Sequence, residues 1–247
     1  MTEKLEQAST LGERIKEALA FKTIFTVRLG SISIPISETV VTTWIVMAIL
    51  IVASLLLTRR LREVPKGSQI FLEGLVGGLN DFFKNQIGHH WKHFAPWLGT
   101  VALFLGVANI ISFFSPLGGF GFEPPFSLKP PTRDINVTAA LAIMTILLVI
   151  VSGIAFKGFR NWIKTFFAPA PFMLPFNMIE YAIKPMSLCL RLFGNILGSF
   201  IIMEIIAMLA PLFLPPIASL YFDFFDGLIQ AVVFTFLSTL YISEAIE

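Results

Sequence analysis

The sequence predicts an all-α integral membrane protein with about five membrane helices, the last two long and steeply tilted, plus an amphipathic surface helix. Of its 247 residues, 55% are hydrophobic and 14% are charged, whereas a soluble domain has about 25% charged residues. Several runs of about twenty residues, the length that crosses a bilayer, carry almost no charge. This composition excludes a cytosolic globular enzyme and a disordered chain. The net charge of +2 gives no reason to expect nucleic acid as a partner.

We interpret residues 1–247 as a single membrane domain that begins with an N-terminal arm, 1–38. Acidic and basic residues alternate with leucines over the first half of this arm, a pattern typical of a short surface helix. Serine and isoleucine alternate over 31–36 and are interrupted by Pro35, which predicts an extended segment. Cys189 is the single cysteine, so no disulfide can form within the chain.

Three shorter apolar segments, 39–58, 96–115 and 135–156, are predicted to cross the membrane. Basic residues follow directly after the first segment (Arg59, Arg60, Arg62) and the third (Lys157, Arg160, Lys164). Positive residues favour the cytoplasmic side. The sequence therefore predicts that the N-terminus lies outside and the C-terminus in the cytoplasm.

Residues 66–95 show apolar residues at helical spacing with polar residues between them, so we expect an interfacial helix on the cytoplasmic face. His89 and His93 have the i,i+4 spacing that two metal ligands can use. The segment lacks the glutamate of the common zinc motif, and no second ligand cluster accompanies it. We therefore predict interfacial histidines and no metal site.

The glycines and prolines of 116–134 predict a loop without regular structure.

Two long segments, 176–210 and 217–246, complete the chain. As single helices they would be about 52 Å and about 45 Å long, against a hydrocarbon layer of about 30 Å. Either they tilt steeply or Pro185 breaks the first one. We favour steep tilt, because no basic cluster interrupts either segment to form a further loop.

Charged residues inside membrane segments are costly and therefore mark candidate functional sites. On the first long segment, Arg191 shares one helical stripe with Glu180, Lys184, Ser187 and Asn195, all within about 40° of it. An arginine keeps its charge in a protein, so this stripe holds a fixed cation. Glu204 lies on a different side of the helix, about 140° away.

On the second long segment, Asp223, Asp226 and Gln230 lie within about 60° of one another, and Tyr241 returns to the same stripe. Such a line of acid, amide and phenol can hydrate and pass protons. The alternative is that these buried charges pair only to lock two helices together. Asp223 and Asp226, near the outer end, can also be simply hydrated.

Several segments of the chain resemble a known protein family. Ser187 to Asn195 (SLCLRLFGN) closely resembles the signature of subunit a of the F-type ATP synthase. The segments Glu38–Met47, Pro131–Thr138 (with Asp134), Gln230–Phe234 and Tyr241–Ile242 look like other parts of that family. The resemblance covers the chain from about residue 38 to its end.

The resemblance implies a non-catalytic stator subunit, without a cofactor of its own, that forms two half-channels against a rotating ring of c subunits. Arg191 would be the arginine that faces the ring carboxylates, and Asn195 and Gln230 would line the proton route. Many members carry Glu nine residues after the arginine, where this chain has Phe200, and His seven residues before the glutamine, where it has Asp223. The candidate ion-translocation residues are Arg191, Asn195, Gln230, Asp223, Asp226, Glu180, Glu204, Ser187, Asp134 and Tyr241.

The implied partners are the c-subunit ring, the peripheral-stalk b subunits, the other F1Fo subunits and the lipid bilayer. The implied location is an energy-transducing membrane, the plasma membrane of a bacterium. H⁺ and Na⁺ both fit this chain, because the ion-binding carboxylate would lie on the ring. The rival functions are a stand-alone secondary transporter or channel and a membrane-embedded enzyme. A stand-alone secondary transporter or channel would more often show internal repeats, and the sequence shows none. A membrane-embedded enzyme would need an acid pair, an activated nucleophile or a metal motif in the membrane segments, and none stands out there.

Overall fold

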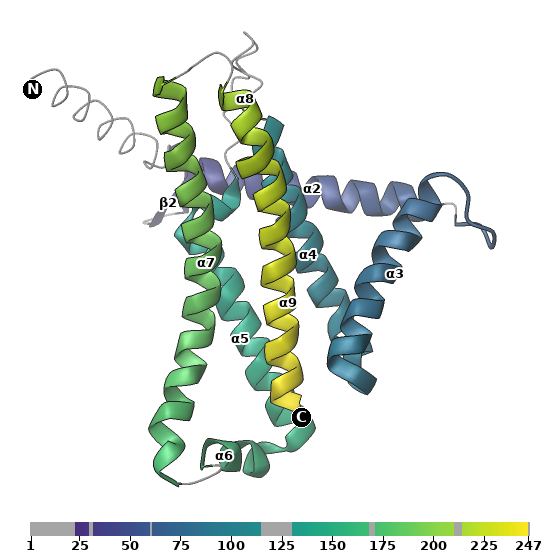
Figure 1. The fold of residues 1–247 in the computed structure, drawn as a ribbon, viewed down its shortest axis with the longest axis vertical. Coiled ribbons are helices and arrows are strands. Elements are labelled where there is room, and N and C mark those ends of the chain that lie inside the picture. The colour runs from purple at the N-terminus through teal and green to yellow at the C-terminus, as the bar shows by residue number, and fades with distance from the viewer. Residues whose placement is uncertain are drawn as a thin grey trace, which may run out of the picture.

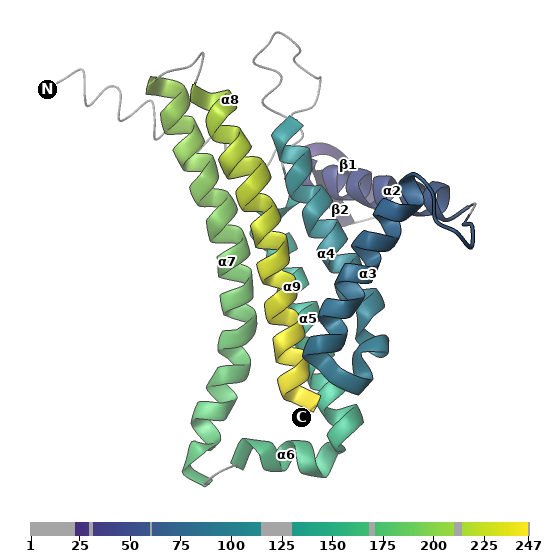
Figure 2. The ribbon, with the colours of Figure 1, turned by 45° about the vertical axis from the view of Figure 1, so that its right-hand side comes forward.

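The computed structural model describes residues 23–29, 32–59, 61–114, 130–167, 171–209 and 214–246. Five helices of this described part are long and apolar enough to cross a membrane. This confirms the predicted all-α membrane fold. The predicted helix within residues 1–20 and most of the 116–134 loop lie outside the described residues. Figures 1 and 2 show a bundle of long helices with one helix, α2, lying across it.

A small β-hairpin precedes the helices and adds to the predicted all-α fold. Strand β1 (Thr23–Leu29) pairs antiparallel with β2 (Ile32–Ser37), with Thr26 opposite Pro35 and Val27 opposite Ile34. The alternating segment over 31–36 predicts this extended conformation but not its partner. The first strand was missed because Thr23–Leu29 has only a weak alternating pattern of its own.

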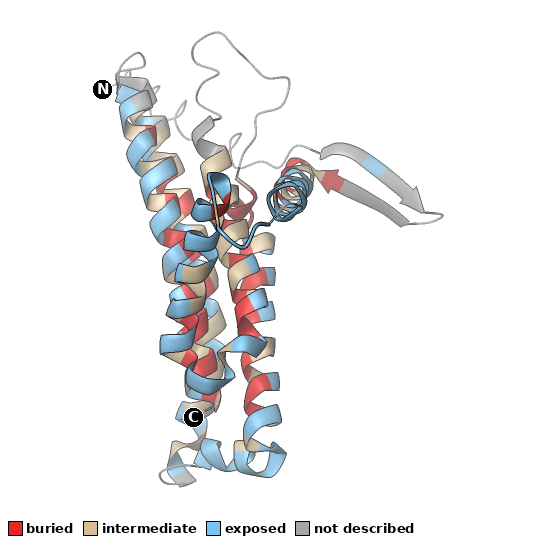
Figure 3. Cartoon of the chain, turned by 90° about the vertical axis from the view of Figure 1, so that its right-hand side faces the viewer, coloured by how far each residue is buried: buried red, intermediate tan, exposed pale blue. Residues whose placement is uncertain are grey.

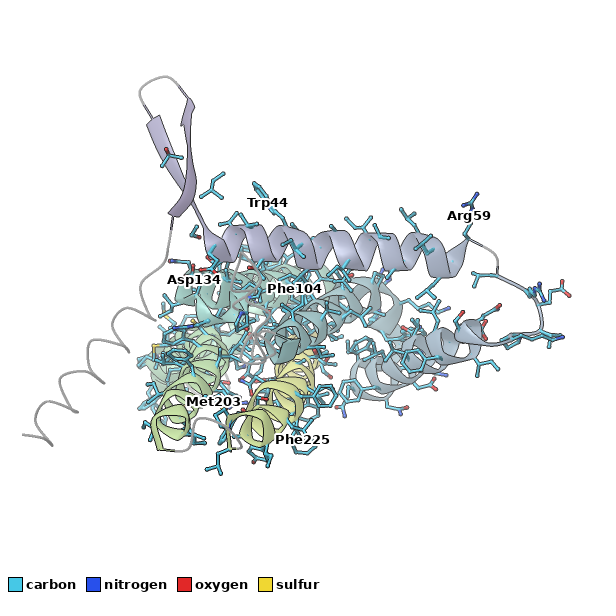
Figure 4. The ribbon with its side chains drawn as sticks, turned by 90° about the horizontal axis from the view of Figure 1, so that it is seen from above. Trp44, Arg59, Phe104, Asp134, Met203 and Phe225 are labelled. Carbon is cyan, nitrogen blue, oxygen red and sulfur yellow. The ribbon has the colours of Figure 1, made fainter. Side chains whose placement is uncertain are left out.

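The buried residues of helix α2 (Glu38–Thr58) lie in its first half. Its buried residues are Glu38, Thr39, Thr42 and Val46. There the Thr39 hydroxyl donates a 3.0 Å hydrogen bond to Oδ2 of Asp134. From this attachment α2 runs across the long helices toward Arg59, as the view from above shows (Figure 4). Most of its apolar surface is exposed, as expected for a helix that faces lipid.

Helices α3 (Ser68–Ile87) and α4 (Trp91–Phe114) form a hairpin through a 3-10 turn at Gly88–His90. The sequence predicts one interfacial helix over 66–95 and a span from 96, whereas the structure ends the first helix at Ile87 and begins the second at Trp91. The reason is Gly88, whose φ of 70° is a left-handed conformation that suits glycine and stops the helix.

Helix α5 (Ile135–Lys157) begins after a 3-10 turn, η3, at Pro131–Arg133. The prolines of this stretch predict a loop without regular structure, whereas the structure has a short 3-10 turn here. Proline is favourable at the first position of a helical turn, because its missing N–H needs no partner there. Asp134 caps α5 by accepting a 2.9 Å bond from the Asn136 N–H.

Helix α6 (Phe159–Phe167) is a short helix that the sequence patterns do not predict. Gly158, with φ of 78°, separates it from α5. Helix α7 (Leu174–Leu209) then follows the 3-10 turn η4 (Pro171–Met173). It runs through Pro185 without a break, so of the two alternatives for this segment the unbroken helix is the one observed.

The last segment starts as α8 (Leu214–Ser219), passes through a π-helical turn, η5 (Leu220–Phe225), and continues as α9 (Asp226–Ile246). Helices α7 and α9 lie side by side and antiparallel in both views (Figures 1 and 2). We call the two ends of this pair the α8 end and the α6 end; the C-terminus lies at the α6 end (Figure 1).

The core is formed by α3, α4, α5, α7 and α9, and buried residues run along the inner sides of the long helices (Figure 3). One apolar cluster includes Phe83, Leu98, Val149 and Ile242. A second is centred on Leu105, Leu141, Leu188, Leu192 and Phe234. The second cluster packs α7 against α4, α5 and α9, and it fixes which side of α7 remains open.

Candidate ion-translocation site

Arg191 lies on the open side of α7. Its neighbours Leu188 and Leu192 are buried in the core, whereas the Arg191 side chain is exposed. Among the described residues, no ion pair or hydrogen bond to the Arg191 guanidinium is found. A cation is expensive at membrane depth unless a carboxylate or water meets it. Arg191 is therefore poised to meet a group outside this chain.

Toward the α8 end, three side chains form the Asp226 cluster: Asn195 and Ser199 on α7 and Asp226 at the start of α9. The Asn195 amide donates a 2.5 Å hydrogen bond to Oδ2 of Asp226. The Ser199 hydroxyl donates to the same oxygen at 3.3 Å. The two donors fix the Asp226 carboxyl group against α7.

Toward the α6 end, three other side chains form the Lys184 cluster: Glu180 and Lys184 on α7 and Glu244 on α9. The Lys184 Nζ lies 2.9 Å from Oε1 of Glu180 and 2.9 Å from Oε2 of Glu244. The lysine side chain is 11% exposed, but the two carboxylates are 52% and 56% exposed. The cluster is therefore open to water on its carboxylate side.

A cavity of about 130 Å³ adjoins the Lys184 cluster. Its lining is largely polar or aromatic and includes Lys157, Asn177, Tyr181 and Tyr241. The Tyr241 ring lies 5.3 Å from the Lys184 Nζ, within cation–π range. The cavity provides room for water next to the charged residues at this end of the α7–α9 pair.

The two clusters lie on either side of Arg191 along α7. From Lys184 to Arg191 the helix rises by about 10 Å, and from Arg191 to Asn195 by about 6 Å. Both clusters connect α7 to α9. Between them α7 buries the apolar side chains Leu188 and Leu192, whereas α9 buries polar as well as apolar side chains: Gln230, Phe234, Thr235, Ser238 and Thr239.

A hydrogen-bonded junction lies beside the Asp226 cluster. The Asn109 amide, on α4, donates a 2.8 Å bond to the carbonyl of Gly227, and its oxygen accepts a 2.9 Å bond from the Thr132 hydroxyl. Next to Thr132, Arg133 is only 6% exposed, and its guanidinium carbon lies 3.7 Å from the centre of the Phe200 ring. The junction thus joins α4, η3, α7 and α9.

The structure brings several predicted site residues together and separates others. Asn195 contacts Asp226, and Glu180 and Tyr241 surround Lys184. Asp134 is buried at the start of α5, where it binds Thr39 and Asn136. Gln230 is buried one turn after Asp226, and Ser187 is half-buried; no hydrogen bond to either side chain is found within the described part of the chain. The side chains of Asp223 and Glu204 lie outside the described residues.

Sequence reasoning missed Asn109, Thr132, Arg133 and Glu244. Asn109 is a polar residue inside an otherwise apolar span, and that alone could have marked it. Glu244 could not have been paired with Lys184, because 60 positions separate them.

The His90 and His93 rings pack against Phe156. In the described ranges no group of three or more His, Cys, Asp or Glu residues could hold a metal ion.

The chain is similar to a protein-family model and to individual known proteins. Residues 40–243 match the family model described as "ATP synthase A chain". The chain is 36% identical over 222 residues to "ATP synthase subunit a, sodium ion specific" of Propionigenium modestum, covering 88% of this chain and 76% of that protein. It is 39% identical over 214 residues to "ATP synthase subunit a" of Moorella thermoacetica, covering 87% and 93%.

Proposed function

This chain belongs to the ATP synthase subunit a family and is a non-catalytic, ion-translocating membrane subunit of an F1Fo complex; on that premise we propose that Arg191 separates two half-channels that open at the Asp226 cluster and at the Lys184 cluster. The observation that carries the proposal is the exposed Arg191 side chain between two polar connections from α7 to α9.

The ring of c subunits is the partner that Arg191 meets in this proposal. The α7 face near Arg191 is open: a Cβ added at Gly194 or Gly198 would have no atom within 4 Å in this chain. Glycines on a membrane helix let a neighbouring helix approach closely. A ring carboxylate can therefore come within reach of the guanidinium. The peripheral-stalk b subunits are proposed as further partners.

The coupling ion, proposed to be H⁺, enters from outside at the Asp226 cluster and neutralises a ring carboxylate. A neutral acid can turn into lipid, whereas a carboxylate cannot do so at acceptable cost. When the acid has travelled around the ring it meets Arg191, whose fixed positive charge favours the ionised carboxylate. The proton then leaves inward past Glu180, Lys184 and Tyr241.

Arg191 also prevents a short circuit. Its positive field repels a proton that would pass directly from one half-channel to the other. One charge moving through 100 mV supplies about 2.3 kcal/mol, so several ions must pass for each ATP made. Direct leakage would waste this energy without turning the ring.

The arrangement of α2 supports the steep tilt of α7 and α9. Helix α2 has 21 residues, which is about the thickness of the hydrocarbon layer, whereas the 36 residues of α7 exceed it. Because α2 runs across α7 and α9, the three cannot all stand upright (Figures 1 and 4). An upright α2 with strongly tilted α7 and α9 fits all three lengths.

The protein is an integral membrane protein, and we place it in a bacterial plasma membrane. Basic residues follow α2, at Arg59 and Arg62, and surround α6, at Lys157, Arg160 and Lys164. Since positive residues favour the cytoplasmic side, the α6 end and the C-terminus are inside and the start of α2 is outside. The Asp226 cluster is then the outer entrance.

The decisive test replaces Arg191 in the assembled F1Fo complex, reconstituted into liposomes. Arg191→Ala is expected to abolish ATP-driven proton pumping and ATP synthesis and to leave only passive leak. The control, Arg160→Ala, removes an exposed cation of α6 and should pump like the wild type. Normal coupled pumping by Arg191→Ala would refute the proposal. Pumping that requires sodium and resists protonophores would replace H⁺ by Na⁺ as the coupling ion.

A further inference from the structure

Helix α6 is an amphipathic element that the proposed ion path does not use. It lies crosswise to the long helices at one end of the bundle (Figures 1 and 2), and it lies across the view in Figure 3, where α2 is seen end-on. Because α2 and the long helices cross the membrane, a helix that is crosswise to both directions runs along the membrane surface. Helix α6 therefore lies where phospholipid headgroups are found.

One face of α6 is fixed to the rest of the protein. The centres of the Trp162 and Phe166 rings lie 6.3 Å and 4.9 Å from the centre of the Tyr181 ring of α7. The indole fills the space beside Gly153 of α5, where an added Cβ would lie 2.8 Å from the Trp162 Cδ1. The Asn177 amide donates a 2.8 Å hydrogen bond to the Phe166 carbonyl. These contacts determine which sides of α6 face away from the protein.

A second face of α6 exposes large apolar side chains, which we call the apolar stripe. Its members, Phe159, Ile163 and Phe167, recur every fourth residue and are 59%, 38% and 45% exposed. Phe172, in η4, and Phe176, near the start of α7, are exposed just after α6 in the chain. Removing such side chains from water is favourable. The acyl chains of a membrane can cover this stripe, which the protein leaves exposed.

Two exposed cations of α6, Arg160 and Lys164, form a basic stripe next to the apolar one. They are four residues apart and lie about 80° around the helix from the apolar stripe. Lys157, the last residue of α5, adds a third cation. The sequence has no acidic residue between Asp134 and Glu180, and within the described ranges none of the three cations forms an ion pair. Anions from outside the chain are therefore needed to balance them.

The two adjacent stripes favour a phospholipid over a protein as the partner of α6. An anionic phospholipid carries acyl chains and a phosphate group in one molecule, and the two parts meet at the membrane surface. The stripes lie side by side on a helix that runs along that surface. An acidic protein would match Arg160 and Lys164, but it would have to displace lipid from the exposed apolar stripe beside them.

We propose that α6 binds anionic phospholipids, whose acyl chains cover the apolar stripe and whose phosphate groups bind Arg160 and Lys164. Each lysine or arginine near an anionic membrane surface strengthens binding by about fivefold. Because Trp162 and Phe166 attach α6 to α5 and α7, the bound lipids hold this end of the bundle at the headgroup layer. The inference depends on the membrane fold and goes beyond the ion path proposed above.

The test identifies the lipids next to α6 in the intact F1Fo complex. The complex is reconstituted into phosphatidylcholine vesicles that contain a small fraction of a photoreactive lipid, either phosphatidylglycerol or phosphatidylcholine, with the reactive group on an acyl chain. After illumination, mass spectrometry of the digested chain measures how strongly each probe labels residues 159–167. Phosphatidylglycerol is expected to label this segment at least about fivefold more than phosphatidylcholine. Equal labelling by the two probes would overturn the inference.

Charge variants separate a specific site from general contact with lipid. The double substitution Arg160→Gln with Lys164→Gln should bring the ratio of the two labels close to one, while labelling by phosphatidylcholine persists. Exchanging the two cations, Arg160→Lys with Lys164→Arg, should keep the wild-type ratio. Arg59→Gln with Arg62→Gln removes two exposed cations at the end of α2 and should leave the labelling of α6 unchanged.

Two further outcomes would contradict the proposal. If the double glutamine variant keeps the wild-type ratio, the cations of α6 do not select the lipid. If neither probe labels α6 and a bifunctional cross-linker joins it to another subunit, this surface is a protein interface. ATP-driven pumping is measured in parallel to verify that each complex is assembled. Because Arg191→Ala tests the ion path and the lipid probes test α6, either proposal can fail while the other stands.

Discussion

The Asp226 cluster and the Lys184 cluster both connect α7 to α9, but they hold carboxylates in different ways. Asp226 accepts hydrogen bonds from two neutral groups, Asn195 and Ser199, and is half-buried. Glu180 and Glu244 share a lysine and are more than half exposed. Asp226 is met by neutral donors, whereas at the other end one lysine lies between two carboxylates.

This difference suits opposite tasks. An entrance must attract a cation and pass it on, so an ionised carboxylate with little counter-charge beside it favours uptake. An exit must release the cation into water, so exposed carboxylates that share a lysine, beside a cavity with room for water, suit this task at the α6 end. The comparison predicts that substitutions at the entrance affect transport more than equivalent ones at the exit.

The largest expected effect comes from removing Asp226, the carboxylate of the proposed entrance. Asp226→Ala should reduce ATP-driven pumping by the reconstituted complex roughly a hundredfold, the scale of losing a positioned proton-transfer group. Glu244→Ala removes an exposed carboxylate of the same helix, and its pumping should fall less than about threefold because exposed ion pairs contribute little. Equal losses in the two variants would contradict the contrast between entrance and exit.

A smaller effect is expected from crowding the junction that holds the start of α9. A Cβ at Gly227 would lie 2.8 Å from the Asn109 Cβ, so Gly227→Ala must push α4 and α9 apart. Such overpacking costs about 1–3 kcal/mol. The melting temperature of the purified complex should fall, and pumping should fall with it.

Gly106→Ala provides the matched control on α4. No atom lies within 4 Å of a Cβ added at Gly106, so the methyl group should be accommodated. In a helix this change removes the flexibility of glycine and stabilises by about 0.5–1 kcal/mol. A Gly227→Ala complex as stable and active as Gly106→Ala would show that the junction does not constrain Asp226.

The smallest expected effect concerns Lys184. Lys184→Met keeps an unbranched side chain but removes the charge that binds Glu180 and Glu244. Because both carboxylates are more than half exposed, the loss should slow pumping less than about twofold. The difference from wild type should shrink as ionic strength rises, since salt screens exposed pairs. Lys164→Met, on exposed α6, should show no salt-dependent difference. A large, salt-independent loss for Lys184→Met would contradict the small contribution expected of a pair with exposed carboxylates.

Local patterns in the sequence predict much of the fold. The apolar run ending at Phe156 corresponds to α5, which extends one residue further, to Lys157. The helical stripe of Glu180, Lys184, Arg191 and Asn195 depends only on an unbroken helix, and α7 is unbroken at Pro185. Within a membrane protein the missing hydrogen bond of a proline is tolerated where neighbouring helices support the backbone.

Local sequence patterns could not predict the contacts between residues far apart in the chain. The 3.7 Å approach of Arg133 to Phe200 joins a loop residue to a helix 67 positions later, and no periodicity encodes it. Nor does the sequence show that Asn109 binds both Thr132 and Gly227. These contacts depend on how α4, η3, α7 and α9 pack, whereas helical stripes depend on one helix at a time.

The π-helical turn at Leu220–Phe225 has a consequence for sequence comparison and engineering. A π turn accommodates one residue more than an α-helical turn. Deleting one residue there is expected to restore a regular α-helical turn, with the helix before and after the turn keeping its register. A single-residue gap aligned to this stretch would therefore leave Asp226 and all later positions on the same side of the helix.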